Sequence, residues 1–203
     1  MNVAVVDYDA GNTLSVTRAL QKVGASVELT PNPERVLAAD AVVLPGVGAF
    51  GDCVRKLRDR GMDEACLEAL RSGKPFLGVC VALQVIFEWS EESPGVQGLG
   101  LLPGGVVRFG DDGLKVPHIG WNELSLVRAH PVFDGLEGEA FYFVHSYYPE
   151  PADEGDLIGE TEYGAWFCSA AGRGNLVAVQ FHPEKSSRAG LKLYDNFLSW
   201  AGG

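Results

Sequence analysis

The chain has 203 residues, with 27 acidic side chains against 16 basic ones, and its formal net charge is −11 at pH 7. Such a charge repels phosphate backbones, so we exclude a basic nucleic-acid-binding protein. No apolar run reaches the roughly 18 residues of a membrane span. The length fits a single domain over residues 1–203. We expect no nucleic acid or membrane partner and, because the first residues lack the features of a secretory signal, a cytoplasmic protein.

The first half of the chain alternates short β-branched runs with segments of helical period. This alternation is typical of a parallel sheet covered by helices. We expect Pro45-Gly46-Val47-Gly48 to end the third strand sharply. The predicted strands cover residues 3–7, 26–30, 41–44 and 75–79, and the predicted helices cover 13–23, a short segment from 33, 50–59, 62–71 and 81–89.

The second half is richer in glycine and proline turns, such as residues 109–114, and favours antiparallel strands. We interpret the acidic stretch 150–154 as a solvated loop. Strands are expected near residues 105–109, 114–118, 140–146, 157–161, 165–169 and 176–181, before a closing helix from about 187 to 200. The fold class is therefore α/β, a layered fold with a parallel or mixed central sheet flanked by helices and an additional antiparallel β part.

The segment Leu77-Gly78-Val79-Cys80 is an apolar strand that passes at once into a helical pattern. A cysteine in such a turn stands at the carboxyl edge of the sheet, beside a helix N-terminus that favours a thiolate and an oxyanion. The sequence therefore offers Cys80 as a nucleophile. Taken alone, the segment is also compatible with a cysteine simply buried at a strand end.

A thiolate nucleophile that acts on an amide needs a nearby general acid or base and a group to orient it. His182 ends an apolar strand, and Glu184 lies two residues on, on the same side of an extended chain. By itself His-Pro-Glu could be a surface turn; with Cys80 it forms a candidate Cys-His-acid triad. His145 could line a pocket or be a satisfied core histidine, and packing is the better interpretation of His118.

The remaining cysteines show no C-x-x-C pair and no zinc-knuckle spacing. Disulfides are not expected in a reducing compartment. We therefore expect no metal and no cofactor, and interpret Cys53, Cys66 and Cys168 as buried hydrophobic residues.

Taken together, the motifs resemble those of class I (triad-type) glutamine amidotransferases, which have a flavodoxin-like layered fold, over nearly the whole chain. The class-level features are Pro45-Gly46-Val47-Gly48, Gly78-Val79-Cys80 with Gln84, and His182-Pro183-Glu184. Further blocks narrow the resemblance to the glutaminase subunits of imidazole glycerol-phosphate synthases. These blocks are residues 7–8 with 11–12, 117–122, 142–147 and 182–186.

This resemblance implies that Cys80 attacks the side-chain amide of L-glutamine, with His182 relaying protons and Glu184 orienting it. It implies oxyanion contacts from the Val47 and Val81 backbone amides. The implied glutamine pocket consists of Gly48, Gln84, Glu92, Ser146 and Tyr147, and the implied contacts to a (β/α)8 cyclase subunit are Asn12, Trp121, Tyr142 and Lys185. The ammonia would pass to that subunit for histidine biosynthesis.

The chain departs from the family at Ala82, where the family usually has glycine. The extra methyl group predicts a tighter nucleophile turn and a cost in rate. The alternatives that remain are the glutaminase subunit of a chorismate- or nucleotide-directed amidotransferase, a non-catalytic glutaminase-like binding module and a cysteine peptidase of similar architecture. Lys185 and the block around Trp121 argue against the first, and Gln84 and Glu92 against the peptidase.

Overall fold

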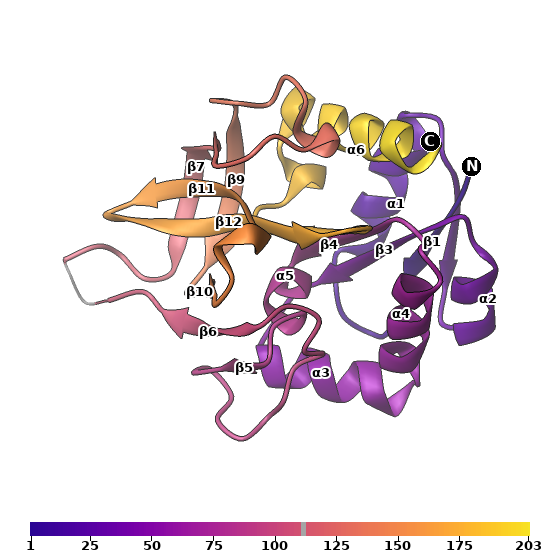
Figure 1. Ribbon diagram of the computed structural model, residues 1–203, viewed down its shortest axis with the longest axis horizontal. Helices are drawn as coiled ribbons and strands as arrows, with labels where there is room; N and C mark the ends of the chain where they lie inside the picture. The colour runs from indigo at the N-terminus through magenta and orange to yellow at the C-terminus, as the bar shows by residue number, and fades with distance from the viewer. Residues whose placement is uncertain (111–112) are drawn as a thin grey trace.

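The computed structural model describes residues 1–110 and 113–203. A central sheet of eight strands runs through the molecule in the order β2-β1-β3-β4-β13-β12-β11-β8 (Figure 1). In that order the strands are Ser26–Thr30, Asn2–Val6, Ala41–Gly46, Phe76–Cys80, Leu176–Val179, Ala165–Arg173, Leu157–Tyr163 and Ser125–Leu126. The sheet is parallel from β2 to β13 and antiparallel beyond it, so the predicted mixed sheet is confirmed.

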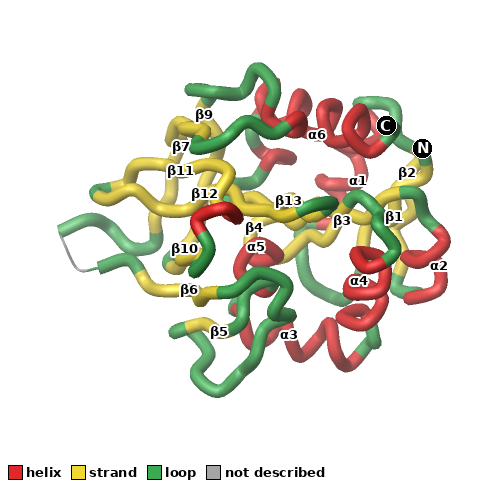
Figure 2. Tube along the Cα trace, viewed as in Figure 1, coloured by secondary structure: helices red, strands yellow, loops and turns green. Residues whose placement is uncertain are grey.

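Helices cover both faces of the parallel part of the sheet. Helices α1 and α6 pack together on one side, while α3 and α4 lie on the other (Figure 2). The helices are α1 (Thr13–Lys22), α2 (Pro33–Ala38), α3 (Phe50–Asp59), α4 (Met62–Arg71), α5 (Val81–Val85) and α6 (Ser187–Ala201). The bounds of α3 and α4 are those predicted from the sequence. Helix α2 begins at Pro33 as predicted, and the Asn32 side chain before it accepts a hydrogen bond from the Glu34 N–H.

Strand β3 continues through Pro45 and Gly46, so the prediction that this segment breaks the strand is wrong. Pro45 pairs with Val79, and Gly46 pairs with Cys80. On the other side of β3, pairing with β1 ends at Val43. Pro45 can remain in the strand because no neighbouring strand on that side needs a hydrogen bond from the N–H that proline lacks.

Helix α5 is shorter than the predicted helix 81–89. The carbonyl groups of Val85, Ile86 and Phe87 accept hydrogen bonds from the backbone of residues 99–102 instead of from a further helical turn. Strand β5 (Trp89–Ser90) follows directly. The returning chain therefore ends this helix by competing for its carbonyls, a tertiary effect that helical periodicity does not reveal.

Two further predictions in the second half are wrong. The strand predicted over residues 114–118 is absent before His118, since Pro117 has no N–H to donate. Strand β7 (His118–Glu123) begins directly after this proline. The acidic loop predicted over 150–154 is partly strand, because β10 (Tyr147–Pro151) pairs with β6 (Gly104–Arg108). Its prolines are tolerated because β10 lies at the edge of its small sheet. Asp111 and Asp112 of the predicted turn lie outside the described residues.

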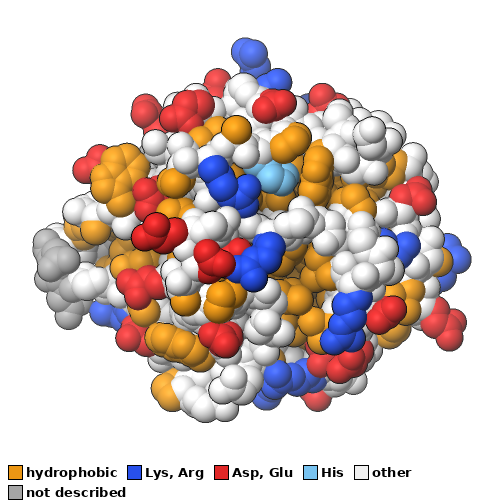
Figure 3. Space-filling model, viewed as in Figure 1, with side chains coloured by type: hydrophobic (Ala, Val, Ile, Leu, Met, Phe, Trp, Pro, Cys, Tyr) orange, Lys and Arg blue, Asp and Glu red, His pale blue; other side chains and the backbone are white. Residues whose placement is uncertain are grey.

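The predicted additional β part consists of two small sheets. One has the order β10-β6-β5, and the other pairs β7 with β9 (Ala140–His145). Short 3₁₀ turns complete the chain: η1 (Pro131–Phe133), η2 (Glu154–Asp156) and η3 (Pro183–Lys185). Acidic and basic side chains are interspersed on the face in Figure 3. Among the described residues, no helix combines the length and apolar character needed to cross a bilayer.

Candidate active site

Cys80 stands at the junction of β4 and α5. Its backbone is left-handed, with φ of 59°, and it precedes the first residue of the helix. Such a backbone is uncommon outside glycine, and a sharp strand-to-helix turn requires it here. The turn brings its sulfur to the carboxyl end of the parallel strands, where 4% of the residue is exposed.

The methyl group of Ala82 fits this turn because Gly78 faces it. A Cβ placed on Gly78 would lie 3.4 Å from the Ala82 Cβ and 2.9 Å from the Ala178 Cβ. Ala82 is buried in the first turn of α5 and is not among the residues with positive φ. The expected crowding at Ala82 is therefore relieved by a glycine on the preceding strand.

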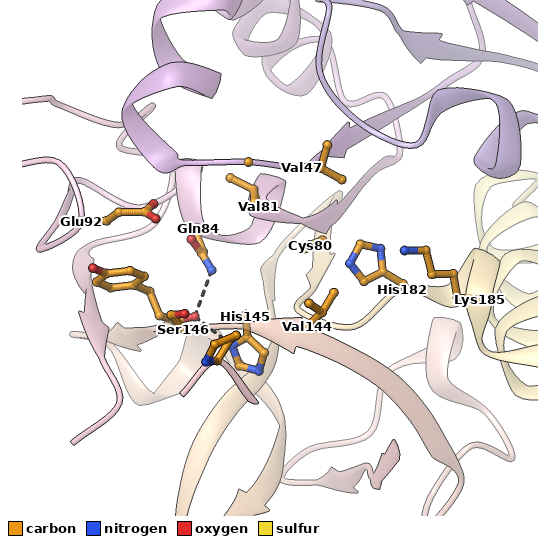
Figure 4. A pocket seen from close by; sticks show the side chains of 13 residues that line it. Val47, Cys80, Val81, Gln84, Glu92, Val144, His145, Ser146, His182 and Lys185 are labelled. Atoms are coloured by element: carbon orange, nitrogen blue, oxygen red, sulfur yellow. Dashed lines mark hydrogen bonds between the residues drawn. The ribbon is translucent and has the colours of Figure 1, made fainter. Parts of the chain in front are cut away.

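His182 and Glu184 lie beside each other just beyond the end of β13. The Nδ1 atom of His182 is 2.9 Å from Oε1 of Glu184, and both side chains are almost fully buried. The Nε2 atom has no hydrogen-bond partner of ordinary length among the described residues. Figure 4 shows the imidazole next to Cys80. The structure thus brings together the three residues of the predicted triad.

Electrostatics favour the protonated form of His182. Burial alone lowers its pKa, but the interactions with the Cys80 thiol and the Glu184 carboxylate outweigh burial and raise the pKa to about 10. A protonated imidazole beside a cysteine stabilises the thiolate. The arrangement can therefore supply a nucleophilic sulfur and a proton donor at the same place.

Asn12 contributes a second hydrogen bond to the Glu184 carboxylate. Its Nδ2 donates to Oε1 of Glu184 over 3.3 Å. Asparagine at this position normally caps a helix, yet the side chain makes no capping bond to α1. The sequence resemblance assigns Asn12 to a partner surface, and the structure adds a contact with the triad.

Cys80 and His182 lie in the wall of a cavity of about 420 Å³ (Figure 4). The other predicted residues that line it are Val47, Gly48, Val81, Gln84, Glu92, Ser146, Tyr147 and Lys185. Pro117, Val144 and His145 also line it. Residues from six separate stretches of the chain therefore meet at one cavity large enough for an amino-acid-sized ligand.

The polar groups of the cavity are tied to the surrounding backbone. The Nε2 atom of Gln84 donates to the Tyr147 carbonyl over 3.0 Å and to Oε1 of Gln180 over 3.1 Å. A carboxylate oxygen of Glu92 accepts the N–H of Phe50 over 2.7 Å, at the N-terminus of α3. The helix terminus favours a negative Glu92, which suits recognition of an ammonium group.

Gln180 is a functional candidate that sequence reasoning missed. It is fully buried, and its Nε2 lies 4.0 Å from the Cys80 sulfur. Gln180 lies two residues before His182, so in an extended segment the two side chains point to the same side. This spacing was the sequence signal that could have identified Gln180. Gln180 thus links Gln84 to the sulfur of the candidate nucleophile.

Three of the predicted partner-facing residues form a connected group at one side of the site. The rings of Trp121 and Tyr142 lie 6.0 Å apart, and the Lys185 Nζ lies 5.6 Å from the centre of the Tyr142 ring. Trp121 is 52% exposed. Because Lys185 also lines the cavity, this surface adjoins the candidate active site.

The other cysteines are buried and free. Burial raises the pKa of Cys66 to about 12 and that of Cys168 further, so these thiols are not poised for nucleophilic chemistry. Within residues 1–110 and 113–203, no group of three or more His, Cys, Asp or Glu side chains is arranged to hold a metal ion.

Comparison with known proteins identifies the class of protein that this fold and site define. The model of the glutamine amidotransferase class-I family matches residues 4–200. The chain therefore belongs to the class I glutamine amidotransferase family. This membership agrees with the family resemblance expected from the sequence motifs.

Individual relatives show which members of this family the chain is similar to. The chain is 51% identical to the imidazole glycerol phosphate synthase subunit HisH of Chromobacterium violaceum, over 100% of this chain and 99% of that protein. It is 48% identical to the subunit of the same name from Methanothermobacter thermautotrophicus, over 97% of both chains. A crystal structure of a glutamine amidotransferase, only 20% identical, covers 99% of both chains with a TM-score of 0.78, so it bears on the fold alone.

Proposed function

We propose that this protein is the glutaminase subunit of an imidazole glycerol phosphate synthase. It hydrolyses L-glutamine and delivers the ammonia to a (β/α)8 cyclase subunit, which makes imidazole glycerol phosphate and an aminoimidazole carboxamide ribotide. The observation that carries the proposal is that Cys80 and His182 line one cavity, with Glu184 hydrogen-bonded to the His182 ring. The full-length similarity to HisH subunits selects this synthase over chorismate- or nucleotide-directed amidotransferases.

In the proposed mechanism, the Cys80 thiolate attacks the carboxamide carbon of glutamine. The backbone N–H groups of Val47 and Val81 stabilise the oxyanion. His182 gives its proton to the departing nitrogen, ammonia leaves and a thioester remains. His182 then takes a proton from the water that hydrolyses the thioester to glutamate, while Glu184 keeps the imidazole oriented.

The proposed pocket places the amino-acid end of glutamine away from the sulfur. Glu92 pairs with the substrate α-ammonium group, and Gly48, Gln84, Ser146 and Tyr147 complete the pocket. Support comes from the position of these residues in the cavity wall and from the hydrogen bond that holds Glu92 at the start of α3. In the complex, Asn12, Trp121, Tyr142 and Lys185 contact the cyclase.

A single substitution tests this function. In the complex with the cyclase, Cys80→Ala removes the sulfur while leaving the cyclase intact, so glutamine-dependent synthesis should stop and ammonia-dependent synthesis should continue. Cys168→Ala is a matched control, because that cysteine is buried outside the cavity. Glutamine-dependent synthesis by Cys80→Ala would overturn the assignment of the nucleophile. Failure of the native chain to react with a glutamine-like electrophile in the complex would favour the inert binding module.

A further inference from the structure

Two histidines outside the triad form a buried pair beside the cavity. His118 at the start of β7 lies opposite His145 at the end of β9, and their exposed fractions are 1% and 6%. The Nδ1 atom of His118 is 3.0 Å from the Nε2 atom of His145, which is a hydrogen-bond distance. His145 lines the cavity, whereas His118 lies behind it.

The pair is linked at each end to a hydrogen-bond acceptor. The Nδ1 atom of His145 lies 2.9 Å from the Tyr147 carbonyl oxygen. The Nε2 atom of His118 lies 2.7 Å from the Asn122 Oδ1. The orientation of the Asn122 amide is fixed, because its Nδ2 donates to the Glu162 carbonyl over 3.0 Å. Both ends of the chain of contacts are therefore oxygens that can only accept.

Counting hydrogens shows what this chain of contacts requires. Two neutral imidazoles carry one N–H each, which is two in all. The chain has three contacts: one to Tyr147, one between the rings and one to Asn122. Each contact needs its own hydrogen, so all three form only when the pair binds one extra proton. In the neutral pair, one of the three contacts has no hydrogen, so two acceptor atoms face each other there.

The surroundings of the pair disfavour a positive charge on it while no carboxylate ligand is bound in the cavity. Tyr163 and Phe143 stack on His118, with ring centres 4.0 Å and 5.1 Å away. Burial lowers the pKa of His118, and it lowers that of His145 to about 3. The titratable groups that share the cavity wall with His145 are Cys80, Glu92, Tyr147, His182 and Lys185.

Glutamine hydrolysis changes that charge balance. The C–N bond of the amide breaks, a C–O bond to water forms, and the products are a carboxylate, neutral ammonia and one proton. Ammonia must leave unprotonated to act as a nucleophile on the partner, so the proton stays behind with the carboxylate. We propose, on the basis of the proposed function, that His118 and His145 together form a one-proton site that holds this proton while glutamate occupies the cavity.

Nuclear magnetic resonance of the full chain with ¹⁵N-labelled histidine tests the proposal, because the shift of each ring nitrogen reports its protonation. His130, whose Nδ1 accepts the Val132 N–H elsewhere in the molecule, is an internal reference. At neutral pH, saturating L-glutamate should convert one lone-pair nitrogen of the His118–His145 pair to the protonated form. His130 should not change.

Substitutions at Asn122 test the hydrogen count without any ligand. Asn122→Asp places a negative acceptor at His118 and should raise the pH at which the pair takes up its proton by about one unit. Asn122→Leu removes that acceptor and should lower this pH. Thermal unfolding of each variant checks that the fold is retained.

The outcomes separate the proton site from the proposed function. Equal titration of the pair in the native chain and both Asn122 variants would overturn the one-proton site. If glutamate shifts other cavity resonances but leaves the pair neutral, the link to the product is wrong. If no resonance responds to glutamate, the result counts against the proposed function as well as against the link to the product. Even then, a higher protonation pH in Asn122→Asp and a lower one in Asn122→Leu would support the one-proton site.

Discussion

Replacing Glu184 with glutamine should lower the pKa of His182. The substitution keeps the size of the side chain and an acceptor for Nδ1, but it removes the charge 2.9 Å from the ring. A hydrogen bond to a charged group contributes about 1.5–3 kcal/mol, and one pKa unit corresponds to about 1.4 kcal/mol. Both side chains are nearly buried, so solvent screens this interaction little. We therefore expect the pKa of His182 to fall from about 10 by about one to two units.

The same pair predicts how stability depends on pH. The pKa of His182 is raised in the folded protein, to about 10 from an ordinary 6.5. The stabilisation is therefore fully present below about pH 6.5 and is lost as the pH rises through 10. In Glu184→Gln, this loss should occur at lower pH.

The assay for both effects combines ¹⁵N-histidine resonances with urea unfolding between pH 6 and 10. Glu160→Gln is a matched control, because Glu160 lies on β11, outside the cavity wall and the hydrogen bonds of the triad. Titration of His182 at the same pH in the native chain and in Glu184→Gln would refute the reasoning.

Three further substitutions test the geometry of the site. Asn12→Ser keeps an N-cap residue but removes the amide that donates to Glu184. Glutamine turnover in the complex should therefore fall about tenfold, with little change in the unfolding midpoint. A turnover rate equal to that of the native chain would contradict this role of Asn12. Gly78→Ala pushes a methyl group to 2.9 Å from the Ala178 Cβ and should lower the free energy of unfolding by about 1–3 kcal/mol, measured in urea. Ala82→Gly should lower it by about 0.5–1 kcal/mol without raising turnover, whereas a clear gain in rate would show that the methyl group does strain the turn.

The sequence alone determined the parallel half of the fold and the chemistry offered by the site. Helices 50–59 and 62–71 follow from local periodicity, and the cysteine and histidine motifs follow from residues near one another in the chain. These features depend on short-range patterns, because a strand that passes into a helix places its last side chain at the sheet edge in any α/β layer. The sequence also indicated Asn12 as functional, although not its contact with Glu184.

Only the tertiary structure decided features that depend on distant segments. Helix α5 ends early because the backbone of residues 99–102 takes its last carbonyls, and β3 accommodates Pro45 because its pairing with β1 ends at Val43. Gln180 reaches the Cys80 sulfur only because β13 inserts beside β4. The His118–His145 pair likewise forms only when β7 and β9 align. Register and competition for hydrogen bonds between remote strands carry no local pattern, so these contacts emerge only in the folded chain.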